Sequence, residues 1–153
     1  MDLILWRHAD AREAEDELAD LDRPLTPKGE RQAQRMAHWL HRHIPDSTRI
    51  LVSPALRARQ TADALNRKYK LASELAPERT VTELLAAVRW PEARQPVLVV
   101  GHQPTLGLAM AYLLAALPQP WAFRKGAVCW LRCREREGQE GVVLHAMVAP
   151  DLL

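Results

Sequence analysis

The sequence predicts a three-layer α/β/α fold with a mostly parallel central sheet and an antiparallel edge. Short apolar runs alternate along the chain with amphipathic helical segments, a pattern typical of βαβ units. Near the carboxyl end, two strand-like segments flank a charged hairpin at 134–141, and they should pair antiparallel at the edge of the sheet. No linker or internal repeat interrupts this pattern. Because 153 residues with 48% apolar content suffice for one core, we expect a single domain over 1–153.

Three apolar runs, 3–6, 51–52 and 97–100, are expected to be buried strands. Thr26 followed by Pro27 predicts the start of a helix, since threonine caps helices and the missing N–H of proline is harmless in the first turn. The apolar stripe of that helix is Ala33, Met36, Ala37, Leu40 and Ile44, and Pro45 should end it.

Ser53-Pro54 and Pro104 are the corresponding start signals for two further helices. Their expected buried stripes are Ala58, Ala62, Leu65 and Tyr69 in one, and Leu106, Ala109, Met110, Leu113 and Leu117 in the other. Between them, 75–90 is predicted to be a loop followed by a helix with Val81, Leu84, Leu85 and Val88 on one face.

The composition argues against several classes of protein. A net charge of +2, with basic residues scattered along the chain, gives no support for nucleic-acid binding. The sequence has no apolar run of membrane-spanning length and no signal peptide, so we expect no membrane association and a soluble, cytoplasmic protein. Cys129 and Cys133 lie in one predicted strand, too far apart for a disulfide. No metal-ligand spacing occurs, and we expect neither a metal nor a cofactor.

Four polar residues follow the predicted strands. Arg7 and His8 come directly after the first strand, Arg57 lies in the first turn of the helix after the second, and His102 ends the third. Side chains in the first turn of a helix lean back toward the preceding strand, and open α/β sheets bind ligands at the carboxyl ends of their strands. We therefore expect all four side chains to share one site.

These residue types suit phosphoryl transfer. A neutral imidazole, His8, can attack phosphorus and hold the phosphoryl group covalently. The guanidinium groups of Arg7 and Arg57 match phosphate oxygens and stay charged, and His102 can donate a further hydrogen bond or carry a proton. Helix N-termini near Ser53-Pro54 and Pro104 would add partial positive charge.

The three segments, in this order, resemble the histidine phosphatase (phosphoglycerate mutase-like) superfamily, and above all its SixA-type phosphohistidine phosphatases. The segment 23–29 (RPLTPKG) and the terminal 147–150 (MVAP) extend the resemblance over nearly the whole chain. It implies that His8 is the nucleophile and that Arg7, Arg57 and His102 bind the phosphoryl group. One departure is Ala9, where the superfamily usually has glycine.

A general acid is not evident in the sequence. Members that cleave phosphate esters usually protonate the leaving oxygen with a carboxylic acid, and here only Glu78 and Glu83 lie in the corresponding region, outside any matching motif. Phosphohistidine has a basic leaving nitrogen that needs no strong acid. The sequence therefore favours phosphohistidine on a protein, a phosphocarrier or a histidine-containing phosphotransfer domain, over esters.

Two alternatives remain open. One is a phosphomonoesterase acting on a small phosphorylated metabolite or on phosphoserine, with Glu78 or Glu83 as the acid. The other is a non-catalytic phosphate-binding interaction module, against which the intact Arg7, His8, Arg57 and His102 set argues. The acidic segment 9–22 is either a solvated loop or a rim of the pocket that repels small polyanions and favours a protein with basic flanks.

Overall fold

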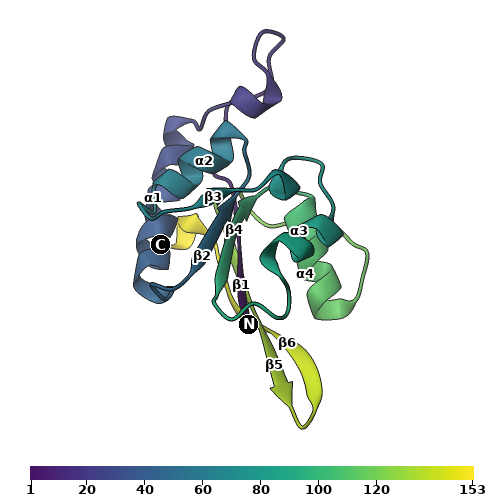
Figure 1. Cartoon of the computed structure of the whole chain (residues 1–153). Coiled ribbons are helices and arrows are strands. Elements are labelled where there is room, and N and C mark those ends of the chain that lie inside the picture. The colour runs from purple at the N-terminus through teal and green to yellow at the C-terminus, as the bar shows by residue number, and fades with distance from the viewer.

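The protein, a computed structural model describing residues 1–153, has one six-stranded sheet with helices on both faces (Figure 1). The strand order is β3-β2-β4-β1-β5-β6, parallel from β3 to β1 and antiparallel from β1 to β6. This arrangement confirms the predicted three-layer α/β fold. The strands are β1 Asp2–Arg7, β2 Arg49–Val52, β3 Lys70–Leu71, β4 Val97–Gly101, β5 Val128–Arg136 and β6 Gln139–Val148. The helices are α1 Pro27–His43, α2 Leu56–Asp63, α3 Val81–Val88 and α4 Thr105–Ala115. Three short 3₁₀ turns are η1 Asp20–Asp22, η2 Ser73–Leu75 and η3 Pro150–Leu152.

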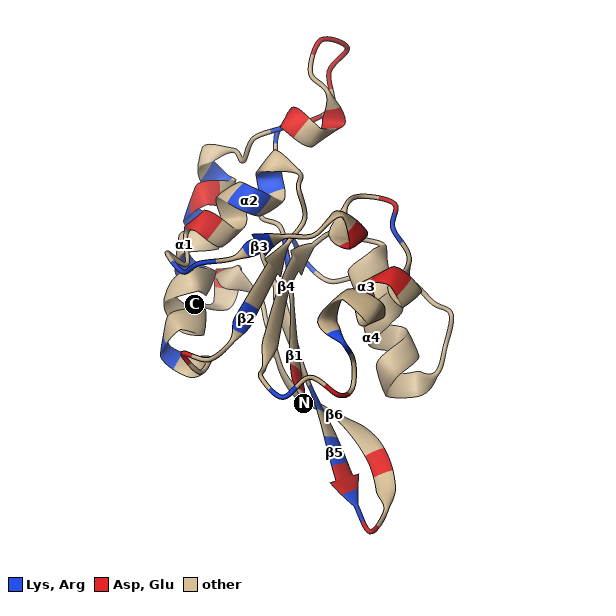
Figure 2. Ribbon diagram, viewed as in Figure 1, with Lys and Arg blue, Asp and Glu red and all other residues tan.

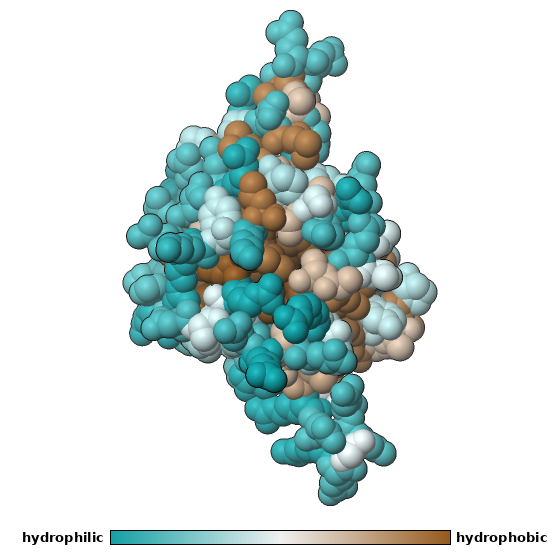
Figure 3. Space-filling view, viewed as in Figure 1, coloured by the Kyte–Doolittle hydropathy of each residue, from teal (hydrophilic) through white to brown (hydrophobic).

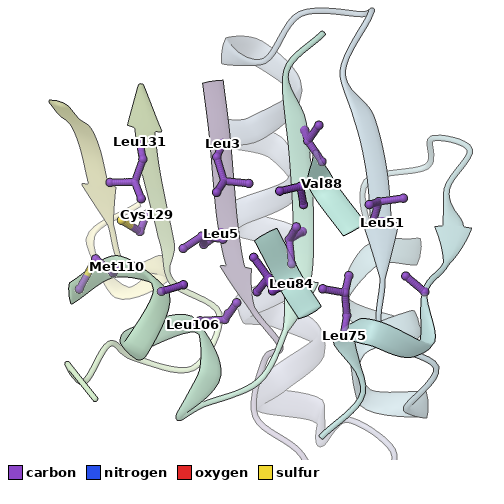
Figure 4. Close-up of a cluster of buried hydrophobic side chains, with 14 of the residues drawn as sticks. Leu3, Leu5, Leu51, Leu75, Leu84, Val88, Leu106, Met110, Cys129 and Leu131 are labelled. Atoms are coloured by element: carbon purple, nitrogen blue, oxygen red, sulfur yellow. The ribbon is translucent and has the colours of Figure 1, made fainter. Parts of the chain in front are cut away.

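Strand alternation assigns the buried side chains to two cores. In β1, Leu3 and Leu5 face a cluster that includes α3 and α4 residues (Figure 4), whereas Ile4 and Trp6 face one built on α1 and α2. Successive side chains of a strand point to opposite faces, so a strand covered on both sides is apolar throughout. The continuous apolar run at the start of the chain is thus explained by its central position in the sheet.

The start of α1 is as predicted, because the Thr26 hydroxyl accepts a hydrogen bond from the amide of Gly29 at 3.0 Å. The prediction for α2 was wrong by two residues, since that helix begins at Leu56 and not at Ser53-Pro54. The Ser53 hydroxyl is fully buried against His102, and it accepts a hydrogen bond only from the nearby Ala55 amide at 3.2 Å. The Ser53 side chain, which was expected to cap α2, instead makes a long-range hydrogen bond with His102.

Two further sequence assignments change. Leu65, Tyr69 and Leu117 lie beyond the ends of α2 and α4. Leu65 and Tyr69 still pack against the core on α1 and α2, whereas Leu117 is exposed. The segment 134–141 is mostly strand, because β5 and β6 run through it to a two-residue turn at Glu137-Gly138, where φ is 52° and 77°. Positive φ at both positions is typical of such hairpin turns. The two-residue strand β3 carried no recognisable sequence signal.

Two projections extend from the body of the molecule. One is the arm formed by 12–22, above the carboxyl ends of the parallel strands, and the other is the β5–β6 hairpin at the opposite end (Figure 1). Hydrophilic residues cover the tips of both (Figure 3). Cys129 and Cys133 are free thiols, as expected from their spacing. None of the helices has the length and apolarity needed to span a membrane.

Candidate active site

The structure brings Arg7, His8, Arg57 and His102 together in one pocket of about 350 Å³ at the carboxyl ends of β1 and β4. The rings of His8 and His102 lie 5.1 Å apart between centroids. His8 follows β1 with its amide bonded to the Gly101 carbonyl at 3.0 Å, which fixes the two strand ends side by side. The other residues that line the pocket are Ala11, Glu13, Arg23, Pro77, Glu78, Gln103, Pro104 and Lys125.

Three of these four side chains hold a buried polar atom that has no hydrogen-bond partner: Arg7 Nε, Arg57 Nε and His102 Nδ1. Each side chain is anchored through another atom. Arg7 Nη1 donates to the Phe123 carbonyl at 2.9 Å, Arg57 Nη1 donates to the Asp20 carbonyl at 2.7 Å, and His102 Nε2 bonds the Ser53 hydroxyl at 2.7 Å. Buried polar atoms without partners are rare in folded proteins. Three such atoms therefore belong to side chains of one pocket, and two of them are guanidinium donors.

A hydrogen bond assigns the proton of the His8 imidazole. His8 Nδ1 lies 2.8 Å from the Ala9 carbonyl oxygen, which can only accept, so Nδ1 carries the proton and Nε2 keeps a free lone pair. His102 Nε2 lies 2.7 Å from the Ser53 hydroxyl, which can either donate to this nitrogen or accept from it. The neutral His8 ring thus presents an unprotonated nitrogen.

Burial keeps both rings neutral. Desolvation is the largest cause that lowers the pKa of His8 to about 4, opposed by its bond to the Ala9 carbonyl and assisted by the charges of Arg57 and Arg7. Desolvation, followed by the charge of His8, likewise lowers the pKa of His102 to about 3. At neutral pH His8 is therefore in the form whose lone pair can attack phosphorus.

Ala9, the departure from the usual glycine, fits the site without strain. It is fully buried, and its amide donates to the Thr61 hydroxyl at 3.0 Å. Thr61 in turn donates to the carbonyl of Arg57 at 2.7 Å. This chain of bonds ties the end of β1 to the first turn of α2 and so places His8 relative to Arg57. Sequence reasoning missed Thr61, because a threonine inside a helix carries no signal of such a contact.

Asp20 is a second residue that sequence reasoning did not single out. Its carboxylate lies 3.2 Å from Arg57 Nη2 and 3.0 Å from Arg23. The acidic arm (Figure 2) is thereby attached to the pocket. Glu13 from the same arm lines the mouth. The only available signal was the acidic character of the segment as a whole.

The structure separates the two candidate acids. Glu78 lines the pocket, in a turn where its φ is 69°. Glu83 does not line it, since its carboxylate completes the capping box of α3 with Thr80 and pairs with Arg79 at 3.0 Å. The hydrogen bond from the Thr80 side chain is the largest cause that lowers the pKa of Glu83, which keeps it ionised and unsuited to donate a proton at neutral pH. No group of three or more metal-ligating side chains occurs in the protein.

The scaffold is of the α/β class, and its pocket holds two histidines and two arginines at the strand ends, side chains whose chemistry suits an oxyanion. Comparison with known proteins gives the family. The model of the histidine phosphatase superfamily (branch 1) matches residues 3–83, and the chain belongs to this superfamily.

Several relatives are similar over most of their length. The phosphohistidine phosphatase SixA of Escherichia coli (strain K12) is 37% identical over 122 residues, which cover 74% of each chain. The SixA homolog of Haemophilus influenzae is 30% identical over 129 residues, or 74% of this chain and 77% of the relative. A solved structure of the protein histidine phosphatase SixA complexed with tungstate superimposes with a TM-score of 0.79 at 28% identity, over 99% of both chains.

Proposed function

We propose that this protein is a phosphatase that hydrolyses phosphohistidine on a phosphorelay or phosphocarrier protein through a covalent phospho-His8 intermediate. The observation that carries the proposal is the gathering of Arg7, Arg57 and His102 around a neutral His8 in one pocket, where Arg7 Nε, Arg57 Nε and His102 Nδ1 have no partner within the fold. Tungstate is a tetrahedral oxyanion like phosphate, and its presence in a related SixA structure supports the same type of ligand here.

In the first step, His8 Nε2 attacks phosphorus while the bond between phosphorus and the substrate nitrogen breaks. The departing imidazole takes its electron pair with it and acquires a proton from water. Arg7, Arg57 and His102 hold the three equatorial oxygens, where charge is spread in the transition state. In the second step, water attacks phospho-His8, the new P–O bond replaces the P–N bond, and inorganic phosphate leaves. His8 returns to its neutral form after it passes the proton gained from water to solvent.

An open pocket suits a protein substrate. The pocket is lined by Glu13 of the arm and by Pro77 and Glu78 of the loop before α3. No helical domain is inserted beside these segments (Figure 1). A phosphohistidine on the surface of a folded domain can approach such a pocket directly. Relatives named phosphohistidine phosphatase agree with this substrate class.

The decisive experiment compares three substrates with one enzyme preparation: a histidine-phosphorylated phosphocarrier protein, a phosphoserine peptide and an aryl phosphate. We expect the phosphohistidine protein to turn over with the highest kcat/KM. Faster turnover of either ester would reject the phosphohistidine assignment. Binding of phosphate without turnover of any of the three would support the non-catalytic module instead.

The phosphomonoesterase is the second candidate function, and the position of Glu78 favours it. This carboxyl group lines the pocket, where a general acid for a leaving oxygen has to be. A metabolite or phosphoserine ester would then be the substrate, and Glu78 would join the catalytic set.

A further inference from the structure

A basic recess of about 390 Å³ lies beside the candidate active site. Five of its eight lining residues are cations from two parts of the chain, and one is a carboxylate. The lining residues are Lys28, Arg31, Gln32 and Arg35 of α1, Arg124 and Lys125 of the segment before β5, and Pro150 and Asp151 of η3. We propose that this basic recess is the docking surface for an acidic patch that flanks the phosphohistidine on the partner protein, an inference that rests on the proposed function.

Three cations of α1 have no ion-pair partner. Asp151 pairs with Arg124 at 3.0 Å and Asp10 pairs with Lys125 at 2.9 Å, whereas Lys28, Arg31 and Arg35 form no ion pair. These three are exposed and lie three and four residues apart, so their charges repel along one side of α1. Lys28 also stands in the first turn of α1, where a cation opposes the helix dipole. An external anion would relieve this repulsion.

Lys125 connects the basic recess to the chemistry. It lines both the recess and the pocket that contains His8. A partner that inserts a phosphohistidine into the pocket must therefore lay part of its own surface over the basic recess. The chemical group that complements exposed lysine and arginine side chains there is a set of carboxylates.

The opposite side of the pocket mouth is negatively charged. The arm exposes Glu13, Asp16 and Glu17, none of which forms an ion pair, and Glu13 lines the mouth. Acidic residues make up much of the arm (Figure 2). The two rims would orient a partner so that its acidic side lies over α1. A nucleic acid fits poorly, because the recess has no aromatic lining and the acidic arm would repel phosphates.

The test uses a histidine-containing phosphotransfer domain with carboxylates beside its histidine, and the same domain with those carboxylates changed to amides. The variant Lys28→Glu/Arg31→Glu/Arg35→Glu should raise KM for the phosphorylated acidic domain at least tenfold with little change in kcat. Its kcat/KM for free phosphohistidine should stay within about twofold of wild type, since the small substrate does not reach the recess. Glutamate at position 28, in the first turn of α1, favours the helix dipole, and positions 31 and 35 are exposed, so the variant should fold.

A matched control changes three exposed arginines elsewhere: Arg94→Glu/Arg134→Glu/Arg136→Glu gives the same net charge, and these residues lie before β4 and in the β5–β6 hairpin. This control should keep the wild-type KM for the acidic domain. The amide domain should show a high KM with every enzyme, and added salt should reduce the difference between the two domains.

Binding of the unphosphorylated acidic domain, followed by calorimetry, separates this inference from the proposed function. A loss of affinity of tenfold or more in the α1 variant alone supports docking, even if phosphohistidine proves not to be the substrate. Equal binding by wild type and variant, no measurable binding, or an equal effect of the control variant overturns the docking surface. Tight binding of DNA or RNA that is lost in the α1 variant would also overturn it.

Discussion

At the amino end of β1, Asp2 accepts two hydrogen bonds from Arg132, each of 2.8 Å, and a third of 3.1 Å from the Trp130 indole. At the carboxyl end of the same strand, Arg7 and His8 lie among further cations, and three buried nitrogen atoms of the pocket have no partner. Arg132 uses both its Nε and its Nη2 on one carboxylate of the fold. Arg7 and Arg57 are held through their terminal nitrogen atoms, and the Nε of each stays without a partner.

The contrast shows how a structural charge differs from a functional one. An unpaired buried donor is destabilising by about 1–3 kcal/mol, so a fold retains several together only where a ligand completes them. Asp2 and Arg132 complete each other, and no further group is required. The predictions below test whether the two ends of β1 differ in function as they do in hydrogen bonding.

The largest effect is expected at the nucleophile. His8→Ala should abolish turnover, and acid-quenched wild-type enzyme should carry a phosphate on His8 that is labile in acid and stable in alkali, as a phosphoramidate is. Mass spectrometry of the quenched enzyme locates the label. His38→Ala, on the exposed side of α1, is the control and should keep full activity. Label on another residue, with His8→Ala still active, would falsify the covalent mechanism.

Arg57 and Arg132 provide a matched pair of substitutions, one at each end of β1. Arg57→Ala should lower kcat/KM by about a hundredfold or more, because one preorganised donor to a developing charge contributes about 3 kcal/mol. Arg132→Ala should change kcat/KM by less than about twofold and instead reduce the free energy of unfolding by about 1–2 kcal/mol, since it breaks a partly exposed ion pair. Steady-state kinetics and urea denaturation measure the two quantities. A loss below about threefold for Arg57→Ala would make it a structural arginine like Arg132.

The pH dependence of stability should come from His8 and His102, at the pocket end of the parallel strands. His8 and His102 have folded pKa values of about 4 and about 3, below the ordinary value of 6.5. As the pH falls through about 6.5, these imidazoles take up protons in the unfolded chain but stay neutral in the fold. The free energy of unfolding should therefore fall from pH 6.5 toward pH 4. Urea denaturation of His8→Ala/His102→Ala should show a flatter profile, and an unchanged slope would contradict the assignment.

The candidate acids should matter less. Glu78→Gln and Glu83→Gln should each change hydrolysis of phosphohistidine by less than about tenfold, because its leaving nitrogen is basic. Glu83→Gln should also remove the ion pair with Arg79 and so lower the melting temperature slightly, while glutamine keeps the capping box of α3. Suppose that Glu78→Gln reduces activity a hundredfold and that esters turn over faster than phosphohistidine. The phosphomonoesterase would then replace the proposed function.

No effect is expected from removing metals. EDTA should leave kcat and KM unchanged, because the proposed chemistry uses arginine and histidine side chains for all contacts to the oxygens. Dialysed enzyme assayed with and without EDTA gives the comparison. Inactivation that a divalent cation restores would show that the pocket end of β1 needs a partner beyond the substrate.

The sequence by itself determined the layers and four residues of the pocket. Apolar runs at 3–6 and 97–100 require strands covered on both faces, and Thr26-Pro27 requires a helix start, because these signals depend on local chemistry alone. Arg7, His8, Arg57 and His102 could be placed together because parallel strands end at the same edge of a sheet.

Only the tertiary structure decided which polar groups bond to each other and which have no hydrogen-bond partner. Ser53 was expected to start a helix, but the fold gives its hydroxyl to His102, and α2 begins later. Asp20 reaches Arg57 across 37 positions, and Lys125 reaches Asp10 across 115. No local pattern encodes such contacts, because they depend on loops whose path is set by the packing of the whole chain. The basic recess and the three unpartnered nitrogen atoms arise in the same way, from side chains that meet only after the strands have paired.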